Sequence, residues 1–299
     1  MQAGRLPLYR FEGELPKLIG DGHLGLWFDK FFDRWVRTEE VRKQSRHLPS
    51  EKESKTRGWS IQATHTENPK IDWFQKLLGD GALAGREDLI SESVGRYLRM
   101  VEAHGGRWRV FRTESRFVTG LGRRHPVENG FAWHPTMGVP YLPGSSVKGM
   151  VRAWVERIYS GSVDADVLTR LFGPNLKDRS RGVESRKGAV AFLDAIPCRP
   201  PGLAVDVMTP HYANWSPQDP PGDWRSPTPI PFLTTETRAQ FLFGLLPSGE
   251  VSDSELDRVM EWLAEALDWA GAGAKTAVGY GRMRPDEAEE RLLRQRMRQ

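Results

Sequence analysis

The stretch PGSSVKGMVRAWVERIY, residues 143–159, decides how the rest of the chain is interpreted. Its apolar residues recur at the spacing of one helix face: Val147, Met150, Val151, Trp154, Val155 and Ile158. This stripe predicts an amphipathic helix from Ser145 to Tyr159 with one buried face. Ser145 follows Pro143 and Gly144 and is a residue type that favours the N-cap position.

Predicted strands and a second long helix surround this helix in a regular order. Ser252 and Glu255 form a capping box, which predicts that the second helix runs from about 254 to 270. The chain order strand, helix, strand, strand, helix, strand is that of a ferredoxin-like or RRM-like domain. We therefore predict an α+β fold with a modified ferredoxin-like core over 106–284. Strands are expected in four stretches rich in β-forming or apolar residues: 108–118, 189–196, 240–246 and 280–283.

Residues 1–105 are predicted to form a helical N-terminal region that packs on the core. Residues 47–68 are polar and lack periodicity, which indicates a mobile loop. Apolar or aromatic residues recur at helical spacing in three other stretches, which are predicted to be helices: 25–41, 71–78 and 86–101. The aromatic residues of the first stretch, 25–41, are expected to lie in the core.

An inserted arm or hairpin is predicted at about 200–235, within the core. Leu203, Val205 and Val207 alternate along its first strand, and proline-rich sequence follows. Its aromatic tip, 207–215, suits insertion between nucleic-acid strands or docking on a neighbouring subunit, and a packed surface loop explains it equally well. Residues 285–299 predict a charged C-terminal helix with acids first and arginines last.

The composition of the 299 residues is that of a globular protein, with 38% hydrophobic and 27% charged residues. No apolar run is long enough to span a bilayer, and no secretory signal is recognised. Cys198 is the only cysteine, which excludes an internal disulfide and fits a reducing cytoplasm. We therefore expect a cytoplasmic protein with no metal site and no cofactor.

The net charge of +4 is only mildly basic, but the arginines cluster. Residues 107–125 hold six arginines against one acid, Glu114, and 170–187 and 34–57 are also basic. Such clusters suit a polyanion. Any one of them alone is better explained as a solvated surface.

The predicted helix start at 143–148 has the features of a phosphate site. Backbone N–H groups of a first helical turn lack internal partners, and the helix dipole favours an anion there. Ser145 and Ser146 add hydroxyl donors, while Lys148 and Arg152, four residues apart, are expected to project together opposite the apolar stripe. An ordinary capped surface helix accounts for these residues equally well.

A glycine-rich segment at 271–281 is a second candidate. It is neither a dinucleotide fingerprint, because it follows a helix, nor a Walker loop, because Ala274 precedes Lys275 where that motif needs glycine. Its amides could still face a polyanion. A helix cap at Gly271 explains one glycine but not four. The segment contains Gly271, Gly273, Lys275, Thr276, Gly279 and Gly281.

The third candidate is the segment 120–135, where glycines precede Arg123 and Arg124 and aromatic residues follow. Exposed aromatic rings would stack on bases. His125, His134 or His211 could act as a general base, although no sequence-local partner orients one, and a lone histidine is more often structural.

Taken in order, these segments resemble the RAMP proteins of CRISPR effector complexes. The resemblance covers roughly 108–283. It rests on the run from Gly120-Leu-Gly through Trp133-His134-Pro135 to Val147-Lys148-Gly149, and on the glycine-rich segment. The segment Asp206-Val-Met-Thr-Pro-His-Tyr212 resembles the sixth-subunit branch of that family, from the type III-B (Cmr) effector.

The resemblance implies a non-catalytic subunit that binds RNA in antiviral defence. It implies a position near the 3′ end of the guide (crRNA), beside the fourth and first Cmr subunits, with target RNA as a further partner. Guide pairing would read the sequence while the protein holds the backbone. RNA contact is expected at Arg123, Arg124, His134, Ser145, Ser146, Lys148, Arg152, Gly271, Gly273, Lys275, Thr276 and Gly279.

Two other functions compete with this one. A metal-independent guide-processing endoribonuclease of the RAMP type would use His134 or His125 as its base and the glycine-rich segment to position the scissile phosphate. A nucleotide-binding regulator would use the same segment, and the missing Walker glycine argues against it.

Overall fold

The computed structural model describes residues 22–32, 35–37, 59–61, 69–79, 83–125, 129–175, 180, 186–209 and 229–298. Its centre is an antiparallel sheet in the order β4-β8-β3-β9, with the short β5 also paired to β8. These strands are β3 (Arg107–Thr113), β4 (Val190–Phe192), β5 (Ile196–Pro197), β8 (Gln240–Pro247) and β9 (Met283–Pro285).

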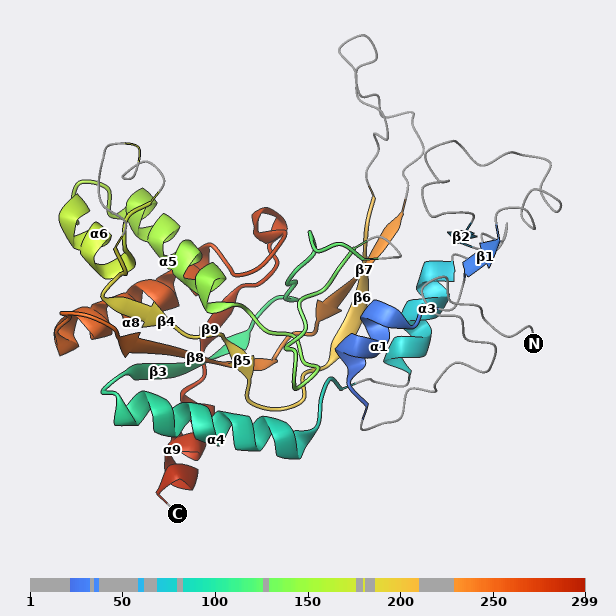
Figure 1. Ribbon diagram of the computed structural model, residues 1–299, viewed down its shortest axis with the longest axis horizontal. Helices are drawn as coiled ribbons and strands as arrows, with labels where there is room; N and C mark the ends of the chain where they lie inside the picture. The colour runs from blue at the N-terminus through green and yellow to red at the C-terminus, as the bar shows by residue number, and fades with distance from the viewer. Residues whose placement is uncertain are drawn as a thin grey trace, which may run out of the picture.

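Two helices connect these strands and lie on one face of the sheet (Figure 1). They are α5 (Gly144–Ile158), between β3 and β4, and α8 (Asp253–Trp269), between β8 and β9. Each strand is antiparallel to its neighbour, so the sheet has the order and directions of a ferredoxin-like domain. The predicted α+β, ferredoxin-like fold class is confirmed.

The main core lies between the sheet and these helices. Val147, Val151 and Val155 of α5 are buried there against Phe241, Phe243 and their neighbours. The predicted capping box of α8 is present, because the Ser252 side chain accepts from the Glu255 N–H and the Glu255 side chain accepts from the Ser252 N–H. A short helix, α6 (Ala165–Phe172), packs on α5 and closes one end of this core.

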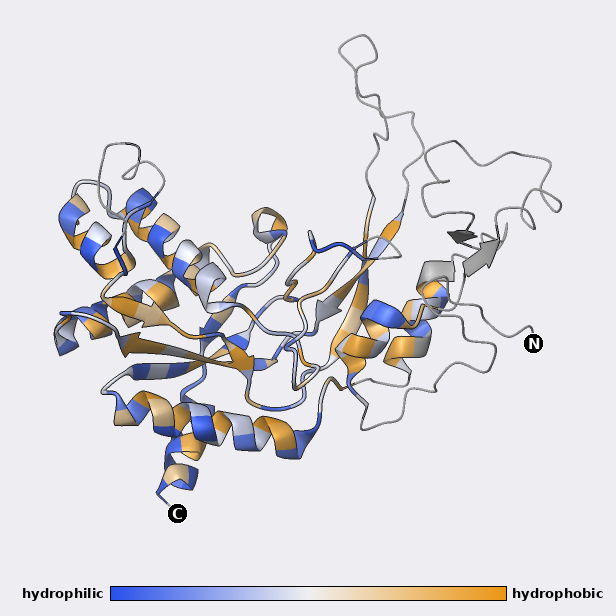
Figure 2. Ribbon diagram, viewed as in Figure 1, coloured by the Kyte–Doolittle hydropathy of each residue, from blue (hydrophilic) through white to orange (hydrophobic). Residues whose placement is uncertain are grey.

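The opposite face of the sheet is also covered. Helix α4 (Glu87–Ala103) lies along it and buries Ile90, Val94, Leu98 and Val101. Helix α9 (Glu287–Met297) adds Leu293 to the same core, with its acids in the first turn and arginines in the last, as predicted. Because both faces are buried, β8 is nearly continuously apolar, and Figure 2 shows it as an orange strand between the helix layers.

A two-stranded hairpin stands beside the main sheet, where the inserted arm is predicted. It pairs β6 (Leu203–Met208) with β7 (Ile230–Thr235). The chain between 210 and 228, which includes residues 210–215 of the aromatic tip, lies outside the described residues. The predicted alternation of Leu203, Val205 and Val207 is only partial: Leu203 is buried, Val205 half-buried and Val207 exposed.

Two N-terminal helices, α1 (Leu24–Lys30) and α3 (Pro69–Leu78), pack on the hairpin. Within the predicted helix over 25–41, α1 ends at Lys30 and Trp35–Arg37 instead forms strand β1, which pairs with β2 (Trp59–Ile61). Residues 33–34 and 38–41 lie outside the described residues. The early aromatic residues of this stretch are nevertheless core, since Phe28 and Phe32 are buried. The predicted loop 47–68 lies outside the described residues except for β2.

The strand predicted over 108–118 ends early, at Thr113. The next residues leave the sheet, and Phe117 exchanges backbone hydrogen bonds with Thr235 of the hairpin. In the described parts of the chain, no helix is both long enough and apolar enough to cross a membrane.

Candidate nucleic-acid interface

A groove of about 900 Å³ lies where three of the segments singled out in the sequence meet. One wall comes from the glycine turn 119–123, one from an outer face of α5 between Ser146 and Ile158, and one from residues within 269–276. The loop carrying the short helix η2 (Thr276–Val278) lies on the same side of the sheet as α5 (Figure 1). The fold thus brings together segments whose outermost residues, Thr119 and Thr276, are 157 positions apart in the chain.

The lining of the groove is positively charged. Arg123 and Arg157 are its charged residues, and no described Asp or Glu lines it. The Arg123 guanidinium lies 5.9 Å from the Tyr141 ring centroid and its Nη2 is 3.4 Å from the Tyr141 hydroxyl. Arg157 sits in the last turn of α5, where the helix dipole favours a cation. The groove is therefore suited to an anionic ligand.

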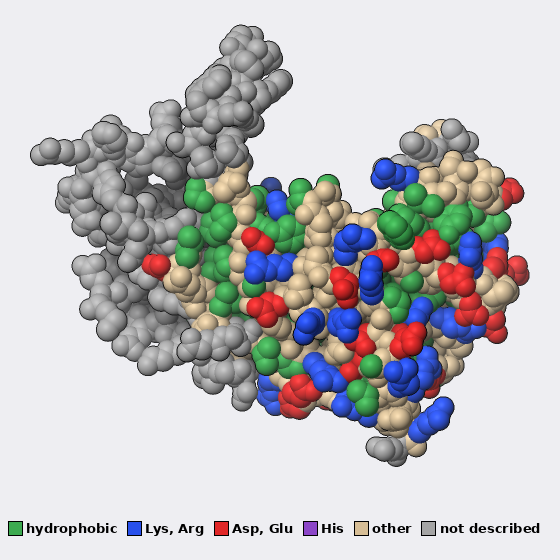
Figure 3. Space-filling view, turned by 180° about the vertical axis from the view of Figure 1, so that it is seen from behind, with side chains coloured by type: hydrophobic (Ala, Val, Ile, Leu, Met, Phe, Trp, Pro, Cys, Tyr) green, Lys and Arg blue, Asp and Glu red, His purple; other side chains and the backbone are tan. Residues whose placement is uncertain are grey.

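Four of the six arginines at 107–125 are paired with acidic side chains. Arg107 pairs with Asp253 and Asp257, and Arg109 pairs with Glu290. Arg112 pairs with Glu114, and Arg116 pairs with Asp206. Figure 3 shows acidic and basic side chains intermixed on the face behind the view of Figure 1. Of the six arginines at 107–125, Arg123 therefore lines the groove. Arg124 follows it in the chain and is exposed.

The start of α5 differs from its prediction. The helix begins at Gly144 and its N-cap is Pro143, which makes no side-chain capping hydrogen bond, so the prediction of Ser145 as the N-cap is wrong. The Gly144 N–H donates to Asp194 Oδ1 at 2.7 Å, and the Ser146 and Val147 N–H groups donate to the Pro143 carbonyl at 2.8 and 3.1 Å. A carboxylate of the protein itself therefore occupies the place expected for a phosphate.

The exposed hydroxyls of Ser145 and Ser146 remain available at this helix start, and Ser146 lines the groove. Gly144 is required for packing, because a Cβ there would overlap the Phe192 carbonyl oxygen. The phosphate-site hypothesis is thus shifted from the backbone amides of α5 to side chains along its outer face.

Lys148 and Arg152 do not project freely, as the sequence suggested. Arg152 Nε donates to Glu156 at 2.7 Å and its Nη1 donates to the Gly173 carbonyl at 2.6 Å, which ties α5 to the end of α6. Lys148 is half-buried, and burial followed by the charge of Arg152 lowers its pKa. Neither residue lines the groove.

The apolar stripe predicted on α5 is fully buried along Val147, Val151 and Val155, while Met150 and Trp154 are half-buried and pack against the same core. Val147, Val151 and Val155 point into the core, whereas Met150, Trp154 and Ile158 line the groove. Ile158 is 52% exposed. The part of the stripe that the core does not cover completely therefore forms a wall of the groove.

The glycine-rich segment folds back on the chain that follows β3. Gly271 ends α8 with φ +76°, and Gly273, with φ +87°, packs so closely that a Cβ would overlap the Val118 carbonyl oxygen. The Ala272 and Ala274 N–H groups donate to the carbonyls of Gly281 and Val118 at 2.9 and 2.7 Å. These amides are internally satisfied, although Gly271, Gly273 and Thr276 line the groove and Gly279 does not.

Lys275 turns away from the groove and towards the hairpin. Its backbone is left-handed, with φ +58°. Its Nζ lies 5.4 Å from the Phe232 ring centroid and 3.9 Å from the Met208 sulfur. In this structure its charge contacts the inserted arm.

A polar network that sequence reasoning missed joins the same two elements. Asp206 of β6 accepts from Arg116 at 2.9 Å and from the Tyr280 hydroxyl at 2.6 Å. Burial opposes ionisation of Asp206, but these hydrogen bonds outweigh it and its pKa is lowered. Burial and the Asp206 carboxylate raise the pKa of Tyr280 to about 12. The partners are far apart in sequence, so no local pattern signals them.

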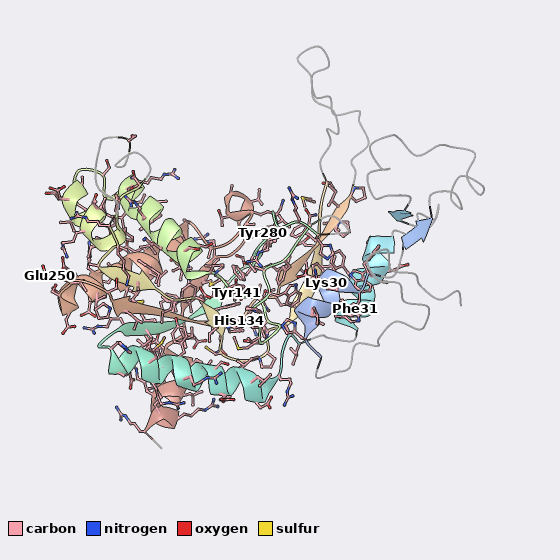
Figure 4. All side chains as sticks on the ribbon, in the orientation of Figure 1. Lys30, Phe31, His134, Tyr141, Glu250 and Tyr280 are labelled. Atoms are coloured by element: carbon pink, nitrogen blue, oxygen red, sulfur yellow. The ribbon has the colours of Figure 1, made fainter. Side chains whose placement is uncertain are left out.

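The described candidate histidines are engaged in tertiary structure. His134 Nδ1 lies 3.1 Å from Thr136 Oγ1, and its ring meets Tyr141 edge-on at 5.5 Å, as the neighbouring labels in Figure 4 indicate. His125 Nε2 is 3.0 Å from the Phe28 carbonyl oxygen. Burial lowers the pKa of both. Neither lines the groove, and His211 lies outside the described residues.

Comparison with known families identifies the scaffold that carries this groove. The model of the RAMP superfamily matches residues 110–284, which include the sheet, both connecting helices and all three groove segments. The chain belongs to the RAMP superfamily. No group of three or more potential metal ligands occurs among the described residues of this RAMP protein.

Two curated relatives confirm the resemblance to the sixth-subunit branch. The Cmr6 subunit of the CRISPR system of Pyrococcus furiosus is 32% identical over 228 residues, which is 58% of this chain and 66% of that protein. The Cmr6 subunit of Saccharolobus solfataricus is 31% identical over 169 residues, 54% of this chain and 50% of that protein. The chain thus spans between half and two thirds of the length of these relatives.

A solved structure shares the fold. A chain of the type III-B Cmr-beta complex bound to cognate target RNA superposes with a TM-score of 0.51 at 24% identity, over 66% of each chain. The RAMP protein differs from an RRM in one respect that matters here. RRMs bind RNA on the open face of the sheet. In this chain α4 and α9 cover that face, which leaves the groove on the helix side.

Proposed function

We propose that this RAMP protein is a non-catalytic RNA-binding subunit of a type III-B CRISPR (Cmr) ribonucleoprotein effector in the cytoplasm. It holds the guide RNA near its 3′ end and supports binding of target RNA, next to other Cmr subunits, the fourth and first among them. One observation carries the proposal: three RAMP-matched segments meet in a groove that holds two arginines and no described acid. The similarity to Cmr6 proteins supports it.

The groove suits recognition of a strand by its backbone. Arg123 and Arg157 supply charge for phosphates, and the hydroxyls of Ser146 and Thr276 supply neutral donors. In such complexes the sequence is recognised by base pairing with the guide, so the protein needs only to bind the shape and the charged backbone of the RNA. Arg124 and Lys148 are placed to add long-range attraction, which is screened by salt.

Salt dependence of RNA binding tests this function. Each phosphate contact on a single strand adds about 0.7 to the slope of log affinity against log salt. The double variant R123A/R157A, measured on the full chain with a short labelled single-stranded RNA, should therefore flatten the slope by about 1.4.

The matched control is R96A, which removes an exposed arginine from α4 on the other side of the sheet. Its slope should equal that of the wild type. An R123A/R157A slope identical to wild type rejects the groove as the phosphate site.

A RAMP-type endoribonuclease remains the competing function, and the structure provides its test. His134 and His125 would have to leave their hydrogen bonds to act as a base. We expect no cleavage when the full chain is incubated with repeat RNA in chelator. Specific cutting that H134A abolishes would establish the nuclease instead.

A further inference from the structure

Trp269 is the most exposed of the large hydrophobic residues that line the groove. It is the last residue of α8, lines the groove, and is 69% exposed. The helix buries Val259, Leu263 and Leu267 along one face. Trp269 follows Leu267 by two positions, about 200° around the helix, so helical geometry directs it away from that core.

The indole of Trp269 has free faces. Within the described parts of the chain, no aromatic ring or cation is recorded against it, whereas Trp262 of the same helix is buried beside Tyr159. Tryptophan is highly buried on average, so an indole left this open in a concave surface needs a reason. An unpartnered aromatic in a groove is the arrangement that accepts a planar ligand.

The other wall of the groove indicates what that ligand is. The α5 face presents Met150, Trp154 and Ile158 together with Arg157, and Arg123 lies on the turn 119–123. Because the groove is lined by two arginines and by no described acidic residue, it suits an anionic ligand. Its apolar residues on α5 suit a ligand with flat rings. A single-stranded nucleic acid combines both, because its phosphates alternate with unpaired bases.

We propose that Trp269 stacks on an unpaired base of the RNA strand whose phosphates contact Arg157 and Arg123. This inference rests on the function proposed above and adds the base contact to it. Stacking is tolerant of sequence, since every base has a π-face. Trp269 thus fixes the path of the strand without reading its sequence.

The test compares W269A and W269F with wild type as full chains, using a short single-stranded RNA and a matched abasic RNA. We expect W269A to bind the normal RNA roughly tenfold more weakly, in the range of a lost base–aromatic contact. Its salt slope should stay that of the wild type, because no charge is lost. W269F should retain most of the affinity, and on abasic RNA wild type and W269A should bind alike.

L89A, at an exposed apolar residue of α4, is the control and should bind both RNAs like wild type. Wild-type affinity in W269A, or an equal loss on normal and abasic RNA, overturns the stacking contact. If R123A/R157A flattens the salt slope while W269A changes nothing, stacking fails and the proposed function stands. If the wild-type chain binds neither RNA, both are rejected. If W269A disturbs only assembly with protein partners, Trp269 is a protein contact and the inference is wrong.

Discussion

At the residue scale, two glycines of the glycine-rich segment differ in their surroundings: Gly273 packs closely against another part of the backbone, and Gly279 does not. Gly273 and Gly279 both have positive φ, at +87° and +95°. A Cβ on Gly273 would overlap the Val118 carbonyl oxygen and approach the Phe117 ring, whereas a Cβ on Gly279 would have nothing within 4 Å. A Cβ added at Gly279 would therefore cause backbone strain alone, whereas a Cβ added at Gly273 would cause backbone strain and steric overlap.

Alanine substitution at these two glycines should therefore have unequal costs. G279A should lower the free energy of unfolding by about 1 kcal/mol, because alanine is strained in the left-handed backbone conformation. G273A should lower it by roughly 3 kcal/mol, because the same strain is combined with steric overlap in a packed site. Urea unfolding of both variants measures the difference. Equal losses would mean that the segment does not pack on Val118.

The network around Asp206 should make stability depend on pH. Its folded-state pKa lies below the ordinary value of 3.8, so its contribution is complete above that pH and is lost as the pH falls through the folded pKa. Wild type should therefore lose more unfolding free energy than D206N between neutral pH and a pH below 3.8. Y280F, which keeps the carboxylate but loses one hydrogen bond, should lie between them. Parallel pH profiles for wild type and D206N would contradict the lowered pKa.

Sequence reasoning located part of the groove residue by residue. Arg123, Ser146, Gly271, Gly273 and Thr276 line it. Lys148 does not line it. Spacing could not show that Arg152 and Lys275 point elsewhere, because Arg152 donates to the Gly173 carbonyl and Lys275 lies over the Phe232 ring, both on other elements. Arg157 and Trp269 were missed because an exposed arginine and an exposed tryptophan carry no local signal.

At the scale of single elements, the capping of a helix could be predicted where the capping residues are close together in the sequence, and could not be predicted where they are far apart. The capping box of α8 joins residues three apart, and it was read directly from Ser252 and Glu255. The start of α5 depends on Asp194, fifty residues away in the chain, so local rules misplaced the cap at Ser145.

The two serines should therefore differ in their effect on stability. S252A removes a real cap and should cost about 1 kcal/mol of unfolding free energy. S145A removes an exposed hydroxyl that caps nothing and should cost within about 0.5 kcal/mol. Chemical denaturation of both variants checks this. A larger loss for S145A would restore Ser145 as the N-cap.

At the scale of the whole molecule, the order of local elements was enough to predict the ferredoxin-like sheet. The helices were indicated by their apolar periodicity and the strands by runs of β-forming or apolar residues, and right-handed connections restrict how these elements assemble. The N-terminal region was expected to pack on the core, but the sheet face that α4 covers was not predicted, because the helical periodicity of α4 shows that one side is buried and does not show what buries it. That covering closes the sheet face on which RRMs bind RNA and leaves the groove beside α5 as the candidate surface.

The most direct measurement of the central claim maps where RNA touches the full chain. Photo-cross-linking with a single-stranded RNA that carries thio-substituted uridines, followed by mass spectrometry, identifies the contacted peptides. We predict cross-links on residues 119–123, on the α5 face that includes Arg157, and on 269–276. Cross-links confined to α4 and α9, or to the hairpin β6–β7, would contradict the groove as the RNA-binding surface.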